Sequence, residues 1–408
     1  MTSLHDPKAG VRRESMRWHA AFWTMVLLTS TLVVAGLHRA ASELYTEKVR
    51  WLGSRYDMID RSLNRIYEIP TESRHRSIVF FGDSTVSQYD HGLALPYLTG
   101  AHLSQMRGRP WVKILTAAAP GSGIVQYGFL ADHVASYEPD LVIWQLSFFQ
   151  FTDRWTARNG APELVGFVHS ERLPEIIAMP VQRYHLSLSD ILLQQGIVRL
   201  GLHDAHGWLR ESQMRFAHMI DLAEDALNPN RGRKPEARAQ TLRGRGYMRR
   251  HMDMTLSKRY SAHGERVHFG RTLEGLDPDD AKLQLLRSGI RALTGDGIEV
   301  LVYLNPTNVD HLRHTGVSYE AGLQRTVNEI RRAAEESGAH FLDLHEMLED
   351  LDFDDAAGHF LEDEIQTVPQ RVSARIAEAA LPILLERERG EEQGRREAER
   401  EGAREAMP

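Results

Sequence analysis

Residues 77–85 read SIVFFGDST, and this stretch decides the fold class. Its apolar run is continuous, as is typical of a strand buried on both faces of a parallel sheet. The run stops at Gly82-Asp83-Ser84, and in open α/β sheets the ligand crevice lies beyond the carboxyl ends of such strands. Ser84 is therefore the first candidate nucleophile, weakly reactive until a base accepts its proton. The alternative is a helix cap, because Asp and Ser commonly cap the helix after a strand.

Four further segments have the same character: residues 112–115, 141–146, 299–304 and 340–342, together with the first strand at residues 78–81. Each is short, mostly apolar and followed by Gly, Ser, Pro, Asn or Asp. With helical stretches between them, they predict an α/β fold around a mostly parallel five-stranded sheet. The interval between the third and fourth strands is about 150 residues, far longer than an ordinary crossover. We therefore expect a largely helical insertion at about residues 160–290.

Composition narrows the function. The chain has 408 residues, of which 42% are hydrophobic and 26% charged, so it has room for one large domain with insertions or for two domains. A formal net charge of −7 gives no basic field over the whole molecule, and we expect no nucleic-acid partner. The absence of cysteine excludes disulfides, thiol nucleophiles and Cys-ligated zinc, and leaves the compartment undecided.

The N-terminal segment predicts a membrane anchor. Residues 18–37 contain no Lys, Arg, Asp or Glu over about the length that crosses a bilayer as a helix. Basic residues precede this segment, so the positive-inside rule places the N-terminus in the cytoplasm and the rest of the chain outside, as a single-pass membrane protein. A cleaved signal peptide, with small residues at 40–42, and a buried helix are the alternatives.

The remaining segments complete the predicted organisation. After an anchor at residues 1–40, residues 41–74 have apolar positions three and four apart and predict a helical neck. A catalytic domain at 75–385 follows, then a charged tail at 386–408 that is expected to be disordered or a frayed helix. Within the insertion, the basic stretch at residues 228–259 is either a surface for an anionic glycan or lipid headgroup or a solvated helix face.

A serine nucleophile requires a base and an oxyanion hole. His359 lies on an expected loop before the last predicted helix, which makes it the candidate base. Asp355, four residues earlier, is the candidate that orients the His359 ring, with Asp352 and Asp354 as rivals.

Together these blocks resemble the SGNH/GDSL hydrolase superfamily. Gly82-Asp83-Ser84 resembles its first block, and Asp355 with His359 resembles its last. The second block has a counterpart in residues 115–123, LTAAAPGSG, where Gly121 is the preferred match. The resemblance implies a three-layer α/β/α fold and a Ser-His-Asp site without a cofactor or metal. It also implies an oxyanion hole formed by the backbone N–H groups of Ser84 and Gly121.

Two departures from the family pattern bear on function. The third family block ends in Gly-x-Asn-Asp, and its Asn is an oxyanion donor, but the corresponding segment here, residues 139–153, contains no Asn. Gln150 and Asn305 are the candidate replacements. The family also commonly shows Asp-x-x-His, whereas Asp355 stands four residues before His359. Loss of the Asn donor favours specialised acyl transfer over general hydrolysis.

The resemblance extends to membrane-anchored members that work beside membrane-bound O-acyltransferases on extracytoplasmic polysaccharides. It implies an esterase or O-acyltransferase that acts on acyl esters, with acetyl the expected group, of a glycan. A non-catalytic glycan-binding or transferase-binding protein is the alternative. A metal-dependent phosphoesterase using Asp83, His345 and His359 is a third class, but the chain lacks the close His/Asp spacing of metal ligands.

Overall fold

The computed structural model describes residues 24–25, 29, 75–87, 94–118, 122–152, 162–179, 188–199, 274–314, 320–349, 352–353, 360 and 367–405. The chain divides into two compact units, residues 1–54 with 197–231 and residues 55–196 with 232–408, and the fold below is that of the second unit. The predicted neck and the basic stretch of the insertion lie outside the described residues. So does the predicted anchor, apart from Thr24, Met25 and Thr29. No helix of the described residues is both long and apolar enough to cross a membrane.

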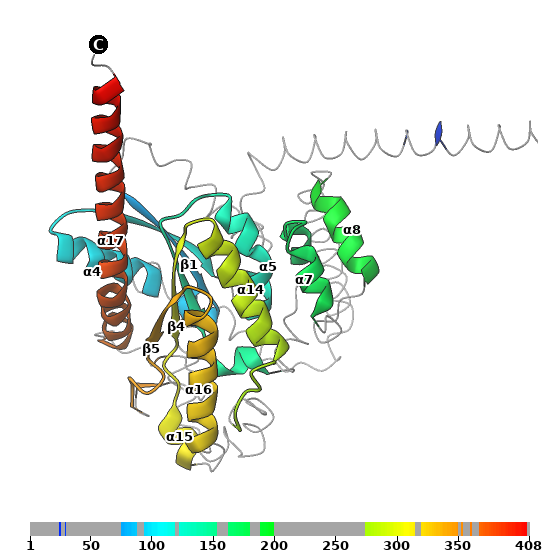
Figure 1. Cartoon of the computed structure of the whole chain (residues 1–408). Helices are drawn as coiled ribbons and strands as arrows, with labels where there is room; N and C mark the ends of the chain where they lie inside the picture. Colours follow the sequence, from blue (N-terminus) through cyan, green and yellow to red (C-terminus); the bar gives the residue numbers. More distant parts are fainter. Residues whose placement is uncertain are drawn as a thin grey trace, which may run out of the picture. The chain divides into compact units, whose positions relative to one another are not determined.

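The second unit is built on one parallel sheet of five strands in the order β2-β1-β3-β4-β5. Figure 1 labels β1, β4 and β5 of this sheet. All four strand pairs are parallel. The strands are β1 Arg76–Gly82, β2 Val112–Ala118, β3 Leu141–Leu146, β4 Glu299–Leu304 and β5 His340–Asp343. This confirms the predicted α/β class and all five predicted strands. β1 and β2 extend beyond the predicted ranges, because Gly82 pairs with Ala118 at the end of the β1–β2 ladder.

Helices cover both faces of the sheet. Alternate strand residues such as Val79 and Trp144 pack against α5 Ile124–Ala135, α14 Ala281–Gly295 and α16 Glu320–Glu335. Their neighbours, including Phe80 and Ile143, pack against α4 Leu95–Arg107 and the first part of α17 Thr367–Glu405. Because helices cover both faces, β1, β3 and β4 are buried over nearly their whole length, which explains their almost continuous apolar runs in the sequence.

Short elements complete the described part of the unit: α3 Ser84–Ser87, η1 Phe148–Phe151, η2 Pro162–Phe167, α7 Leu173–Ala178, α8 Leu188–Arg199 and α15 Val309–His314. The elements η2, α7 and α8 belong to the predicted insertion. Arg172, just before α7, fixes this region to the sheet layer: its guanidinium donates to Asp132 Oδ2 at 2.8 Å and to the Gly128 carbonyl at 2.9 Å, both on α5. The start of the insertion is thus anchored by a partly buried ion pair.

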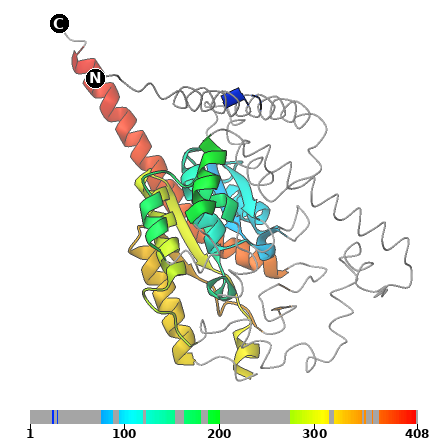
Figure 2. The same ribbon diagram turned by 90° about the vertical axis from the view of Figure 1, so that its right-hand side faces the viewer.

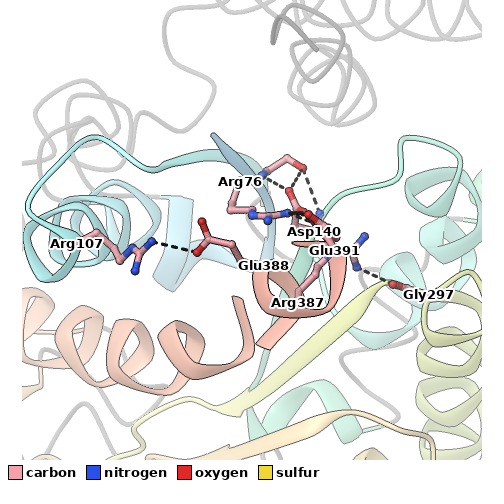
Figure 3. Close-up of polar contacts among 8 residues, drawn as sticks. Arg76, Arg107, Asp140, Gly297, Arg387, Glu388 and Glu391 are labelled. Atoms are coloured by element: carbon pink, nitrogen blue, oxygen red, sulfur yellow. Dashed lines mark hydrogen bonds and ion pairs between the residues drawn. The ribbon is translucent and has the colours of Figure 1, made fainter. Parts of the chain in front are cut away.

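Helix α17 includes residues 386–405 of the predicted tail and extends beyond the sheet (Figure 2). Where it passes the amino ends of the strands, charged side chains hold it in place (Figure 3). Arg387 donates to the carbonyl of Gly297 at 2.7 Å and pairs with Asp140 at 3.2 Å. Glu391 pairs with Arg76 at 2.7 Å, the first residue of β1. These contacts hold the start of the tail, which has almost no large apolar side chain, against the fold, whereas residues 392–401 are exposed.

Asp140 is the centre of this cluster. Its carboxylate accepts hydrogen bonds from Ser77 N at 2.7 Å, Ser77 Oγ at 3.0 Å and Arg76 Nη1 at 2.8 Å. Since Asp140 directly precedes β3 and Ser77 lies in β1, the carboxylate joins the amino ends of two neighbouring strands and α17.

We predict that Asp140→Asn lowers the free energy of unfolding by about 1–3 kcal/mol, because it weakens charge-assisted hydrogen bonds at a largely buried site. Urea unfolding followed by circular dichroism measures the change. Glu378→Gln is the matched control: it removes an exposed ion pair with Arg375 and should cost no more than about 0.5 kcal/mol. Equal effects of the two substitutions would contradict the assigned role of Asp140.

Candidate functional site

The sheet topology places the candidate site. From β1 the chain crosses to β2 on one side, and β3 lies on the other side of β1, so the segments that follow β1 and β3 diverge. In doubly wound sheets of this order, the β1/β3 switch point at the carboxyl edge is where ligands bind. Ser84 is the second residue after β1 and therefore stands at that point.

The Gly82-Asp83-Ser84 turn is compact. A Cβ atom on Gly82 would lie 2.4 Å from Val86 Cγ2, so only glycine allows the short helix α3 to turn back this closely over the end of β1. Asp83, Thr85 and Val86 are buried, whereas Ser84 between them is partly exposed. The turn thus presents one side chain, that of Ser84, and buries its neighbours.

The Asp83 carboxylate organises the interior of the turn. One oxygen accepts from Thr85 N and Thr85 Oγ1, both at 2.8 Å. The other accepts from Ser147 Oγ at 3.3 Å and Gln150 Nε2 at 3.1 Å, both from the segment after β3. A buried carboxylate requires hydrogen-bond donors to offset the loss of water, and here two adjacent strand ends provide them. The segments that follow β1 and β3 are therefore joined beneath Ser84.

Two more buried side chains hold the same turn. Gln145 Oε1 accepts from Asp83 N at 3.0 Å, and Gln145 Nε2 donates to Thr85 Oγ1 at 3.0 Å. Tyr127, on α5, donates its hydroxyl proton to the Gly82 carbonyl at 2.5 Å. The backbone on either side of Ser84 is thereby fixed from both faces of the sheet.

The turn after β2 is described from Ser122 onwards, so the predicted oxyanion residue Gly121 lies outside the described residues. Gly123 N donates to Gln126 Oε1 at 2.9 Å at the start of α5. A Cβ on Gly123 would lie 3.1 Å from Gln150 Cδ, which shows how tightly the ends of β2 and β3 pack.

The two residues proposed to replace the missing Asn lie at the same edge of the sheet. Gln150 uses its side-chain amide to bind Asp83, as described above, and is almost fully buried. Asn305 follows β4: its backbone N donates to the Leu146 carbonyl at 2.7 Å, and its side-chain amide donates to the Pro306 carbonyl at 3.2 Å. The assignment of Gln150 and Asn305 to the oxyanion hole stays a prediction.

The predicted base His359, its partner Asp355 and the rival Asp354 lie outside the described residues. Asp352 is described: it accepts from Glu349 N at 3.1 Å and pairs with Arg371 at 3.3 Å. Phe353 and Phe360 form an isolated antiparallel bridge, so the two ends of this loop meet before the chain enters α17.

A second Asp–His pair, not predicted from the sequence, lies at the carboxyl edge. His345 Nδ1 is 2.5 Å from Asp343 Oδ1, and the His345 ring packs edge-on against Phe148, with 5.8 Å between ring centroids. Asp343 also pairs with Arg331 at 3.2 Å. From the sequence, His345 was a candidate metal ligand only. The available signal was Asp-x-His directly after a predicted strand.

The environment of Asp343 sets its ionisation. Burial opposes the charged form, but the hydrogen bond and charge of His345, a backbone N–H bond and the charge of Arg331 outweigh it, so the pKa of Asp343 is lowered. Among the described residues, no three His, Asp or Glu side chains are grouped so as to hold a metal ion.

Comparison with known proteins gives no independent assignment, since no protein-family model and no curated protein match this chain. The fold and the site define an α/β protein with a parallel sheet and a partly exposed serine at its switch point.

We predict that Asp343→Asn destabilises the protein near pH 6 and that the difference from wild type shrinks towards about pH 3. A lowered pKa in the folded state gives stability that is present above the unfolded pKa and is lost as the pH falls through the folded value. Urea unfolding of both proteins across this range measures the difference. A difference independent of pH would show that the carboxylate charge is not what stabilises the fold here.

Proposed function

We propose that this chain is a membrane-anchored SGNH/GDSL-type serine esterase or O-acyltransferase. It acts outside the cytoplasm on acyl esters, with acetyl the expected group, of a glycan or polysaccharide. The observation that carries the proposal is the partly exposed Ser84 on a buried, hydrogen-bonded turn at the switch point of a parallel sheet. Its strand order, 2-1-3-4-5, suits the SGNH-like fold that the sequence motifs suggest.

In the proposed reaction, Ser84 Oγ attacks the ester carbonyl while His359 accepts its proton. Asp355 orients the imidazole of His359 and stabilises its charged form. The backbone N–H groups of Ser84 and Gly121 donate to the oxyanion of the tetrahedral intermediate. His359 then returns the proton to the leaving alcohol, and an acyl-serine remains.

A water molecule or an acceptor hydroxyl completes the cycle. It attacks the acyl-serine carbonyl and transfers its proton to His359. The bond between the acyl carbon and Ser84 Oγ then breaks, His359 returns the proton to Ser84 Oγ, and the acid or the new ester leaves. No cofactor takes part. Residues 18–37 serve as the anchor in this proposal, and a membrane-bound O-acyltransferase is the proposed partner that supplies or receives the acyl group.

One observation favours the alternative of a non-catalytic glycan-binding or transferase-binding protein. The side-chain amides nearest the position of the missing Asn are engaged elsewhere, Gln150 with Asp83 and Asn305 with the Pro306 carbonyl. A weakened oxyanion hole slows hydrolysis by the cost of one donor, about 10²–10³ in kcat. The catalytic proposal requires Ser84 to react with an ester, whereas the non-catalytic alternative does not.

A fluorophosphonate probe tests the reactivity of Ser84. We expect the probe to label the wild type and Ser136→Ala, and to leave Ser84→Ala unlabelled, because only an activated serine attacks phosphorus at a useful rate. Ser136 is an exposed serine whose hydroxyl bonds the His133 carbonyl, so its variant is the matched control.

Equal labelling of all three proteins would end the catalytic proposal for Ser84. An unlabelled wild type, together with full polymer acylation by Ser84→Ala in cells that lack the native copy, would instead support the non-catalytic alternative.

A further inference from the structure

β3 contains one polar side chain in an otherwise apolar strand. Of its six residues, Leu141–Leu146, only Gln145 carries polar side-chain atoms other than the indole N–H of Trp144, and Gln145 is fully buried. Burying a carboxamide is unfavourable unless its donors and acceptors are bonded. Because Phe81 pairs with Trp144 in the β1–β3 ladder, Gln145 lies beside Gly82, at the base of the serine turn. Its polar head is therefore placed where β1 ends.

The carboxamide of Gln145 brackets Ser84. Its oxygen accepts from the backbone of Asp83, the residue before Ser84, and its nitrogen donates to the hydroxyl of Thr85, the residue after it. Both donor–acceptor distances are 3.0 Å. A single side chain from the neighbouring strand thus holds both flanks of the candidate nucleophile.

The direction of each hydrogen bond is fixed by its partner. The Asp83 N–H can only donate, so it must face the oxygen of Gln145. The Thr85 hydroxyl gives its proton to the Asp83 carboxylate, which can only accept, and therefore receives the N–H of Gln145. The orientation of the amide follows from this order of donors, and a side chain with a different donor pattern cannot replace it.

We propose that Gln145 is a positioning residue for Ser84. By holding Asp83 N and Thr85 Oγ1 it fixes the backbone on both sides of Ser84, and with it the direction of Ser84 Oγ and of the Ser84 N–H. This inference rests on the proposed function, in which Ser84 Oγ attacks and Ser84 N–H donates to the oxyanion. A displacement of about 1 Å at a reacting group can reduce the rate about 100-fold. Loss of the two Gln145 hydrogen bonds should therefore lower the reactivity of Ser84 by more than the accompanying loss of folding stability would suggest.

Gln145→Glu separates positioning from general stabilisation. A neutral carboxylic acid can make the same two hydrogen bonds as the amide: its carbonyl accepts from Asp83 N, and its hydroxyl donates to Thr85 Oγ1. The ionised form only accepts, so it faces the Thr85 oxygen without a proton and repels the Asp83 carboxylate. Burial and the neighbouring carboxylate raise the pKa of the introduced acid, so mildly acidic solution restores the neutral form.

The experiment measures second-order rate constants of fluorophosphonate labelling, each divided by the wild-type value at the same pH. We expect Gln145→Met to label about 10–100-fold more slowly at every pH. Gln145→Glu should be equally slow near neutral pH and recover at least about tenfold by about pH 5. Circular dichroism confirms that each variant is folded at the pH of the assay.

Gln195→Met is the matched control. Gln195 is also buried, and its amide donates to the carbonyls of Val165 and Val168 at 2.8 Å, in the η2 region. The substitution removes a buried amide of the same size without touching the serine turn. Its labelling rate should stay within about twofold of wild type, because its bonds stabilise the fold only.

Thr85 gives a second, milder pair of variants if the Gln145 variants do not fold. Thr85→Ser keeps the hydroxyl and should label like the wild type, whereas the nearly isosteric Thr85→Val removes it and should label about tenfold or more slowly.

Three results would each overturn the positioning role. The first is a wild-type labelling rate for folded Gln145→Met, and the second is a labelling rate of Gln145→Glu, relative to wild type, that does not change with pH. The third is equal labelling rates for the two Thr85 variants. An unlabelled wild type would contradict the proposed function itself, and the inference would fail with it. The two failures are therefore distinguishable by the wild-type measurement alone.

Discussion

The buried carboxylate of Asp83 is the constraint on which the carboxyl edge of this protein depends. A carboxylate without access to water must be surrounded by donors, and no single strand end supplies enough of them. Thr85 from the turn itself and Ser147 and Gln150 from the segment after β3 meet this requirement together. Satisfying one charge therefore joins two loops that diverge at the switch point, and the partly exposed Ser84 is the next residue along the chain after Asp83.

Most of the fold could be predicted because its strands are buried on both faces. Each of the five strands appears in the sequence as a short apolar run that ends at a turn-forming residue, and the parallel order follows from the helical segments between them. Helix α17 was harder, since residues 386–405 alternate charges. Part of their order comes from long-range ion pairs, Arg387 with Asp140 and Glu391 with Arg76, and such pairs leave no local signal in the sequence.

The site was only partly predictable, because some of its residues are recognisable from the local sequence and others act only through contacts across the sheet. Ser84 stands out locally, at the abrupt end of an apolar strand, whereas the residues that hold its turn do so across the sheet. Gln145 acts on residues about 60 positions earlier in the chain, and within its strand it looks like a simple interruption of the apolar pattern. The Asp343–His345 pair was visible as a motif at the end of a predicted strand, but the contact of His345 with Phe148, from the segment after β3, depends on packing that the sequence does not show.

The close approach of Gly82 and Val86 limits the routes by which this turn can evolve. Any side chain at position 82 enters the volume of the Val86 methyl groups, so a larger residue there first requires a smaller one at position 86. Val86 in turn fills the core beneath α4 and α17, and shortening it opens a cavity. A substitution at position 82 alone or at position 86 alone is therefore destabilising. We therefore expect positions 82 and 86 to change together across related chains or not at all.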